Sequence, residues 1–482
     1  MSVTLKIINN FNSAVTNGTD YFGSHYSDDQ VWLFFLNTSG KVKYTPVGAT
    51  KAIAAADSTG IQLSTVKDGT FTLETVEDST KLFAGLGTTD PFTLTNGPGL
   101  FQADVPYAVA EWTIKGDQYD NVDITYIDSF SFPTVATITD SGGTQTGKCG
   151  FRAGTTAEDI MTAFKTLIAT HPMGPDSSQK PTSGVGFGPE VPTVSGSTSK
   201  YRWVGSSKFW VSGPVNKKRG MYTYAPSFHN YLKYLQDNEP TTKTTGGSIK
   251  GWYIDYSGNN GYSGYLSITG SESAGYGLEV HDIRVNTTPS AANDWAADPN
   301  AGTSITGKIT VAANNSSVDH DYTPGTTDQV LGLWTDAVIY SGAALIGTLG
   351  GGPVVTGTHD LAEGKSQNVI VGTFLASISA SITTGLLGSK MYLDAYTGKN
   401  PKSTMYWFNT MTRAESMTKL FGNAWSGTAY AFYDPYWAVL AGATDNQGYL
   451  SPFNDRWSNF SPDKGLSAGD TIQWELGLTK SS

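Results

Sequence analysis

Two carboxylates within residues 111–133, EWTIKGDQYDNVDITYIDSFSFP, have the types and spacing of an acid and base pair. In the segment AVAEWTI, the two-residue period of a strand places Glu111 on the face opposite Ala110 and Trp112. In NVDITYIDSFSF, the same period aligns Asp128 with apolar side chains, where a purely structural strand favours another hydrophobic residue. The pattern predicts Glu111 and Asp128 as catalytic residues. From the residues alone, an edge strand with exposed acids fits the pattern equally well.

Two acids in different environments can perform both halves of glycosidic hydrolysis, because one donates a proton and the other activates a nucleophile. The pattern does not separate these roles. Apolar neighbours favour the protonated form of Asp128, which suits an acid as well as a base. Asp117, Asp120 and Asp123 stand in or beside the turn GDQYDN, so we expect them to be ordinary solvated acids.

Composition favours short strands and excludes several classes of function. Only 15% of the 482 residues are charged, and glycine occurs 55 times, which favours strands joined by tight turns. The net charge is −11 and the only basic cluster is at 217–219, so nucleic-acid binding is not expected. Cys149 is the single cysteine, which excludes an internal disulfide and a cysteine-based metal cluster.

Other motifs fail on inspection. The segment 302–308, GTSITGK, has phosphate-loop spacing, but Ile309 stands where the loop needs serine or threonine. Residues 319–321, DHD, lie in a polar stretch without further metal ligands nearby. The six histidines are scattered, and the chain lacks a G-x-S-x-G nucleophile elbow. No metal and no cofactor is therefore predicted.

The elements that must position the two carboxylates are strands at both ends of the chain. Residues 1 to about 140 contain successive strand-like segments separated by turn residues, as in VTLKIIN, QVWLFFL, IQLSTV and TFTLETV, and this spacing indicates a sandwich or barrel. The segment TTAEDIMTAFKTLIATHP has a capping threonine and an apolar helical stripe. Helices are expected between 155 and 422, at SFHNYLKYLQDN, TTDQVLGLWTDAVIYSGAAL, VIVGTFLASISASITTGLL and WFNTMTRAESMTKLFG. Strands return in GTAYAFYDPYWAVL, LSPFNDRW and TIQWELGLT.

This order predicts a mainly β protein in which one β domain is split by an insertion. The expected divisions are a first β part at 1–150, a mixed α/β domain at 151–427, and returning strands at 428–482. Two uncharged windows, 337–358 and 366–389, are interrupted by glycine, serine and threonine, which favours soluble helices over membrane spans. The first residues, MSVTLKIINNFNS, do not have the pattern of a signal peptide.

Several segments together resemble the glycoside hydrolase family 64 β-1,3-glucanases. Glu111-Trp112-Thr113 resembles the E-F/W-T segment of that family, and ITYID with the following Phe132-Pro133 resembles its second carboxylate segment. Downstream, FHNYLKYL with GYSGYLSITG and the long segment FNTMTRAESMTKLFGNAWSGTAYAFYDPY are similar to later family segments, in the same order. In the last of these, Asp434 is retained, while Pro435 stands where the family has a second aspartate.

The resemblance implies a fold, an activity and a set of site residues. It implies a thaumatin-like β-barrel or sandwich domain beside a mixed α/β lobe, with a cleft between them that binds β-1,3-glucan. It implies an inverting mechanism in which Glu111 is the general acid and Asp128 the general base. The expected substrate contacts are Trp112, Tyr126, Trp252, Tyr433 and Asp434. A non-catalytic glucan-binding or structural protein on the same scaffold is the alternative. By resemblance the protein is expected outside the cell, although an intracellular location stays open.

Overall fold

The structure of this chain is a computed structural model that describes part of the chain. The described residues are 2–36, 43–47, 53–54, 60–74, 80–92, 105–114, 120–127, 129–170, 191–192, 198–199, 203–204, 228–244, 247–256, 261–271, 275–286, 303–304, 308–311, 348–350, 374, 377–395, 413–425, 432–445, 447–451 and 464–478.

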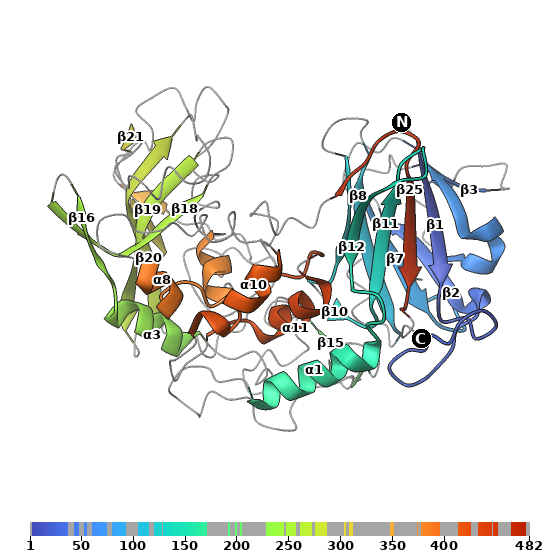
Figure 1. The fold of residues 1–482 in the computed structure, drawn as a ribbon, viewed down its shortest axis with the longest axis horizontal. Helices are drawn as coiled ribbons and strands as arrows, with labels where there is room; N and C mark the ends of the chain where they lie inside the picture. The colour runs from blue at the N-terminus through green and yellow to red at the C-terminus, as the bar shows by residue number, and fades with distance from the viewer. Residues whose placement is uncertain are drawn as a thin grey trace.

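Two open sheets pack face to face in a β sandwich (Figure 1). The seven-stranded sheet has the order β12 (Gln145–Gly150), β11 (Thr134–Thr139), β25 (Thr471–Leu476), β1 (Val3–Asn9), β6 (Thr70–Leu73), β3 (Lys43–Pro46) and β4 (Ile53–Ala54). The six-stranded sheet has the order β24 (Lys464–Gly465), β9 (Asn121–Thr125), β8 (Tyr107–Thr113), β7 (Thr80–Leu86), β2 (Val31–Leu36) and β5 (Ile61–Gln62). The prediction of a mainly β protein is confirmed, and the described strands form open sheets, not a closed barrel.

Alternation along the strands builds the core between the two sheets. In β1, Val3, Leu5 and Ile7 are buried while Lys6 is exposed. In β8, Trp112 is fully buried on the inner face. Such side chains contribute most of the stabilising free energy of a sandwich, at about 25 cal/mol for each Å² of apolar surface buried.

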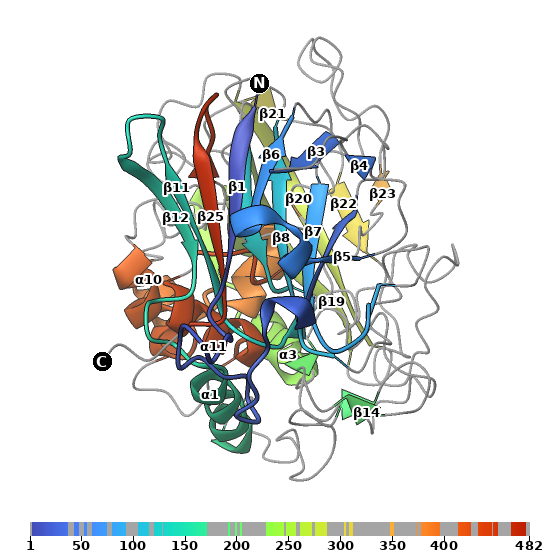
Figure 2. The ribbon, with the colours of Figure 1, turned by 90° about the vertical axis from the view of Figure 1, so that its right-hand side faces the viewer.

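The first and last described strands of the chain lie next to each other. β1 pairs with β25 in parallel, with Thr4 opposite Thr471, and β25 pairs with β11 on its other side. Figure 2 shows blue β1 directly beside red β25. The short β24 likewise pairs with β9 in the other sheet. The division of the chain at 150 and 428 remains a prediction.

The second carboxylate segment is not one continuous strand, which corrects the sequence prediction. β9 ends at Thr125, and a separate two-residue strand, β10 (Ser129–Phe130), pairs with β15 (Trp203–Val204). Tyr126, directly after β9, bonds to two other segments. Its backbone N–H donates to Tyr449 O at 2.7 Å, and its hydroxyl accepts from the backbone N–H of Thr134 at 2.9 Å.

A helical layer closes one end of the sandwich. α1 (Ala157–Thr170) begins as predicted at a capping threonine, since Thr156 Oγ1 accepts from Asp159 N at 3.2 Å. It packs on α11 (Pro435–Thr444), where Phe164 and Tyr436 stack with ring centroids 5.2 Å apart. The prediction of a strand over GTAYAFYDPYWAVL is wrong for 435–440, which belong to α11. A capping side chain before a proline at the first helical position starts a helix there.

A third sheet forms the opposite side of the molecule (Figure 1). Its order is β18 (Trp252–Tyr256), β19 (Gly261–Ser271), β20 (Gly275–Asn286), β22 (Lys308–Val311) and β23 (Thr348–Gly350), and β21 (Thr303–Ser304) pairs with β20. In Figure 1, helices α3 (His229–Asp237) and α8 (Lys390–Ala395) lie beneath this sheet, and α10 (Arg413–Lys419) lies between it and the sandwich. Two small hairpins pair β13 (Val191–Pro192) with β14 (Thr198–Ser199) and β16 (Thr241–Thr244) with β17 (Gly247–Lys250).

A buried helix rich in serine and threonine lies within this second region, at 377–383. Several of its hydroxyls donate to carbonyls within the helix, whereas the buried Ser377 Oγ has no hydrogen-bond partner in the described structure. Ser381 Oγ donates to Ser377 O at 2.7 Å, and Thr383 Oγ1 donates to Ser379 O at 2.9 Å. Bonding to the carbonyl four residues earlier lets polar side chains enter a core without unsatisfied donors. In the described part of the chain, no helix is long and apolar enough to span a membrane.

Some predicted elements cannot be compared with the structure. The helix expected over 326–345 lies outside the described residues, as does most of the segment LSPFNDRW. The helices expected at SFHNYLKYLQDN and WFNTMTRAESMTKLFG are confirmed as α3 and α10.

Candidate active site

Glu111 lies on the outer face of β8, in the middle of the six-stranded sheet. Its side chain is 29% exposed, and its Oε2 lies 3.5 Å from Lys81 Nζ on the neighbouring strand β7. On the other side, Asp123 of β9 is the residue directly opposite Glu111 in the ladder. The strand pairing thus sets a row of three charged residues across β7, β8 and β9, with Glu111 at its centre.

Asp123 is the residue that sequence reasoning missed. Asp120 and Asp123 are 1% and 5% exposed, so the expectation that they are solvated acids is wrong. Segments from the end of the sequence flank β9 on both of its ends, because Leu466 N donates to Asp120 O at 2.9 Å and Tyr449 N donates to Ile124 O at 2.8 Å. Glu111 stands two residues before the end of β8, and Asp123 stands two residues after the start of β9. The sequence offered a signal for Asp123, since two strands joined by a turn place such residues opposite each other and on one face.

An apolar cluster adjoins this charged row. Tyr107 and Val109 precede Glu111 on the same face of β8, and they pack with Phe34, Phe83 and Phe92. The carboxylate of Glu111 therefore stands at the border between an apolar patch and charged groups. A glycosidic leaving group needs a proton donor that is reachable yet held in one place, and the geometry of Glu111 meets both conditions.

Asp128, the second predicted catalytic residue, lies outside the described residues. Ser129, its neighbour in the chain, is buried, and its Oγ donates to Tyr107 Oη at 2.8 Å. Tyr107 and Glu111 are on one strand and one face. The described side chain of Ser129 thus ties β10 to the strand that carries Glu111. Among the described residues, no group of three or more histidine, cysteine or acidic side chains is placed to hold a metal ion.

Three predicted aromatic contacts are core residues, which corrects their assignment to substrate binding. Trp112 and Trp252 are fully buried, and Tyr126 is 1% exposed. Tyr126 Oη lies 2.7 Å from Thr134 Oγ1, and burial raises the pKa of Tyr126 well above its ordinary value. Trp252 Nε1 donates to Leu235 O at 3.0 Å. A ring covered on both faces cannot stack on a sugar, so the prediction is wrong for these three.

The last two predicted contacts lie at the start of α11. Tyr433 is 6% exposed, and burial raises the pKa of its hydroxyl to about 12. Asp434 is the N-cap of α11, because its Oδ1 accepts from Tyr436 N at 2.9 Å and from Trp437 N at 3.4 Å. At 1% exposure, the Asp434 carboxylate is used by the helix, and its predicted role in substrate binding is wrong.

Substitution of the cap tests this structural role. We expect Asp434→Ala to lower the free energy of unfolding by about 1–2 kcal/mol, because two backbone donors at the start of α11 lose their acceptor. Asp434→Asn keeps a capping oxygen, so its free energy of unfolding should fall much less. Urea unfolding followed by fluorescence measures both values, and equal losses in the two variants would contradict the capping role.

Comparison with known proteins finds similarity in structure only. No protein-family model matches the chain, and none of the curated proteins matches its sequence. A GH64 β-1,3-glucanase domain from Clostridium beijerinckii is 13% identical with a TM-score of 0.42, over 99% of this chain and 98% of that one. A GH64 laminaripentaose-producing β-1,3-glucanase from Paenibacillus barengoltzii is 17% identical with a TM-score of 0.22, over 36% of this chain and 44% of that one. A structure of that enzyme complexed with laminarihexaose is 20% identical to this chain with a TM-score of 0.25, over the same shares of the two chains. The structural neighbours of this chain are thus GH64 β-1,3-glucanases at low sequence identity.

Proposed function

We propose that this chain is a glycoside hydrolase that cleaves β-1,3-glucan, with Glu111 as its general acid. The observation that carries the proposal is the position of Glu111, a partly exposed carboxylate at the centre of a sheet, oriented by Lys81 and bordered by apolar side chains. The segments around Glu111 and Asp128 support the substrate class, since they resemble the corresponding segments of the β-1,3-glucanases.

In the proposed reaction, the bond between the anomeric carbon and the leaving oxygen breaks as Glu111 gives its proton to that oxygen. Water attacks the anomeric carbon from the opposite side of the ring, and Asp128 accepts the proton that the water loses. The reaction adds one water molecule across one glycosidic bond and gives two sugars, each with a hydroxyl group at the point of cleavage. The configuration at the anomeric carbon inverts. Lys81 acts as a positioning residue, because its Nζ lies 3.5 Å from Glu111 Oε2 and pairs with the carboxylate that remains once Glu111 has given its proton.

The stereochemistry of the first product tests this mechanism. Proton NMR of a laminarin digest should show the α-anomer before mutarotation mixes the two forms, because direct attack by water inverts a β-linkage. Asp128→Asn should remove most turnover and keep the fold, since the side chains are nearly the same size. A β-anomer appearing first would mean that a carboxylate attacks the sugar directly.

Measuring laminarin binding together with oligosaccharide release separates the enzyme from the non-catalytic alternative. Binding of laminarin without release of oligosaccharides would favour a glucan-binding protein. We further propose that the protein acts outside the cell, because a polysaccharide of this kind does not cross a membrane and its hydrolase must reach it.

A further inference from the structure

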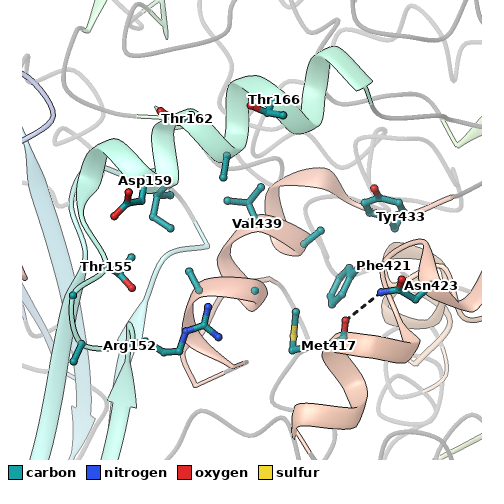
Figure 3. A pocket seen from close by; sticks show the side chains of 17 residues that line it. Arg152, Thr155, Asp159, Thr162, Thr166, Met417, Phe421, Asn423, Tyr433 and Val439 are labelled. Atoms are coloured by element: carbon teal, nitrogen blue, oxygen red, sulfur yellow. Dashed lines mark hydrogen bonds between the residues drawn. The ribbon is translucent and has the colours of Figure 1, made fainter. Parts of the chain in front are cut away.

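A groove of about 910 Å³ opens between α1, α10 and α11, and it shares no lining residue with the charged row around Glu111 (Figure 3). One wall is the exposed side of α1, with Thr162 and Thr166. The other wall carries Phe421 and Tyr433, and α11 contributes Val439 between them. A cavity of this size is in the range of small-molecule and oligosaccharide sites.

Phe421 is held in a backbone conformation that large side chains rarely adopt. Its φ is 53°, in the left-handed region where glycine is the least strained residue. Its backbone N–H donates to Thr384 O at 3.0 Å, which fixes the turn after α10. A bulky ring at such a position indicates a use that offsets the strain. The ring meets Tyr433 and Trp437 edge to face, at centroid distances of 6.3 and 5.3 Å, and it lines the groove.

The charged side chains of the lining are already engaged within the protein. Arg152 Nη1 donates to Asp445 Oδ1 at 2.7 Å. Asp159 Oδ2 accepts from Thr156 N at 2.9 Å and from Thr156 Oγ1 at 2.6 Å. An ionic ligand would therefore compete with bonds that the protein makes itself. What the groove offers a ligand is an aromatic ring, an apolar floor and hydroxyl groups.

A carbohydrate has the complementary chemistry. A pyranose ring presents an apolar face of C–H groups that packs on an aromatic ring, while its edge carries hydroxyls that bond to polar side chains. Thr162 and Thr166 are four positions apart on α1, so their side chains lie on the same side of the helix, about 5–6 Å apart. Both are exposed, and both line the groove, as Phe421 does.

We propose that this groove is a second carbohydrate-binding site, separate from the Glu111 site, which takes a neutral glucan chain with a sugar ring against Phe421. The choice of a β-1,3-glucan as its ligand rests on the proposed function, but binding at the groove does not require hydrolysis. The groove would hold one part of the glucan polymer while another part of the same polymer reaches the Glu111 site.

Binding of the full-length protein to insoluble β-1,3-glucan tests this site. Phe421→Ala should raise the apparent Kd about tenfold, because the stacking ring is lost. Thr162→Val should raise it about threefold through the loss of one hydrogen bond. The matched controls are Phe22→Ala, which removes a phenylalanine that is 47% exposed outside the groove, and Thr146→Val on β12; both should bind like the wild type. Thermal unfolding of each variant identifies any loss of fold, and Thr162→Val remains informative if Phe421→Ala is unstable.

The outcomes for the two sites are distinguishable. Release of reducing sugar from soluble laminaritriose reports on Glu111, and Phe421→Ala should leave it unchanged. If the wild type releases no sugar but both groove variants lose binding, the groove proposal stands and the hydrolase proposal fails. Wild-type binding in both Phe421→Ala and Thr162→Val, or no binding of the wild type to β-1,3-glucan, overturns the groove proposal.

Discussion

Replacing Glu111 by glutamine is expected to lower the turnover number on laminarin by about 10²–10⁴-fold, which is the usual contribution of a positioned general acid. Glutamine has nearly the same size but cannot give up a proton at neutral pH. The loss should appear in kcat and leave KM nearly unchanged, because the amide still fills the same place on β8. Reducing-sugar release at several laminarin concentrations measures both constants.

The fold should survive this substitution. Glu111 is partly exposed, and its ion pair with Lys81 joins side chains that are 29% and 45% exposed, so water screens the pair. We expect the unfolding midpoint of Glu111→Gln to stay within a degree or two of the wild type. Glu74→Gln provides a matched control, because Glu74 is exposed at the end of β6 in the other sheet. Full activity in Glu111→Gln would show that another carboxylate is the acid.

Replacing Trp252 by alanine is expected to lower the free energy of unfolding by about 3–5 kcal/mol, as large-to-small changes of a buried tryptophan do. The side chain is fully buried between β18 and the helices beneath it. Its indole packs against Tyr392 with ring centroids 5.9 Å apart, and its Nε1 donates to Leu235 O. The substitution therefore leaves a cavity and an acceptor in α3 without its donor. Urea unfolding followed by circular dichroism measures the change.

The same variant distinguishes a core residue from a sugar platform. A platform would lose glucan affinity while the unfolding midpoint stayed unchanged, whereas Trp252 should show a large fall in the midpoint. Trp252→Phe keeps part of the buried surface and should lower the free energy of unfolding less than Trp252→Ala does. A stable Trp252→Ala protein with weakened binding would contradict the assignment to the core.

Local patterns predicted the elements, and packing between distant segments decided what the patterns left open. The alternation in AVAEWTI correctly placed Trp112 and Glu111 on opposite faces of β8, but it did not tell that the face of Trp112 meets the core. The capping of α1 by Thr156 was also readable, since capping depends on neighbours in the chain. Such predictions need only residues within one or two turns of each other.

The burial of Asp123 and Trp252 could not be read in this way. Alternation tells which residues share a face, but it does not tell which face another segment covers. Asp123 is buried on β9, and 447–451, more than 300 positions away in the chain, runs beside that strand. Trp252 is covered by α3 and by the segment around Tyr392. From the sequence alone, aromatic residues near a proposed cleft therefore have the features of sugar-stacking residues, although distant segments of the chain cover them.

The pairing of β1 with β25 constrains how this protein can be made. Asn10 Nδ2 donates to Gly477 O across 467 positions of sequence, so the seven-stranded sheet is completed only after nearly all of the chain has left the ribosome. Until then, β1 and β11 each keep one long edge without its central neighbour. Exposed strand edges recruit other chains, and contacts this distant in sequence form slowly. A chain truncated before residue 471 should therefore aggregate during synthesis, and expression at low temperature or with chaperones should raise the yield of the intact protein.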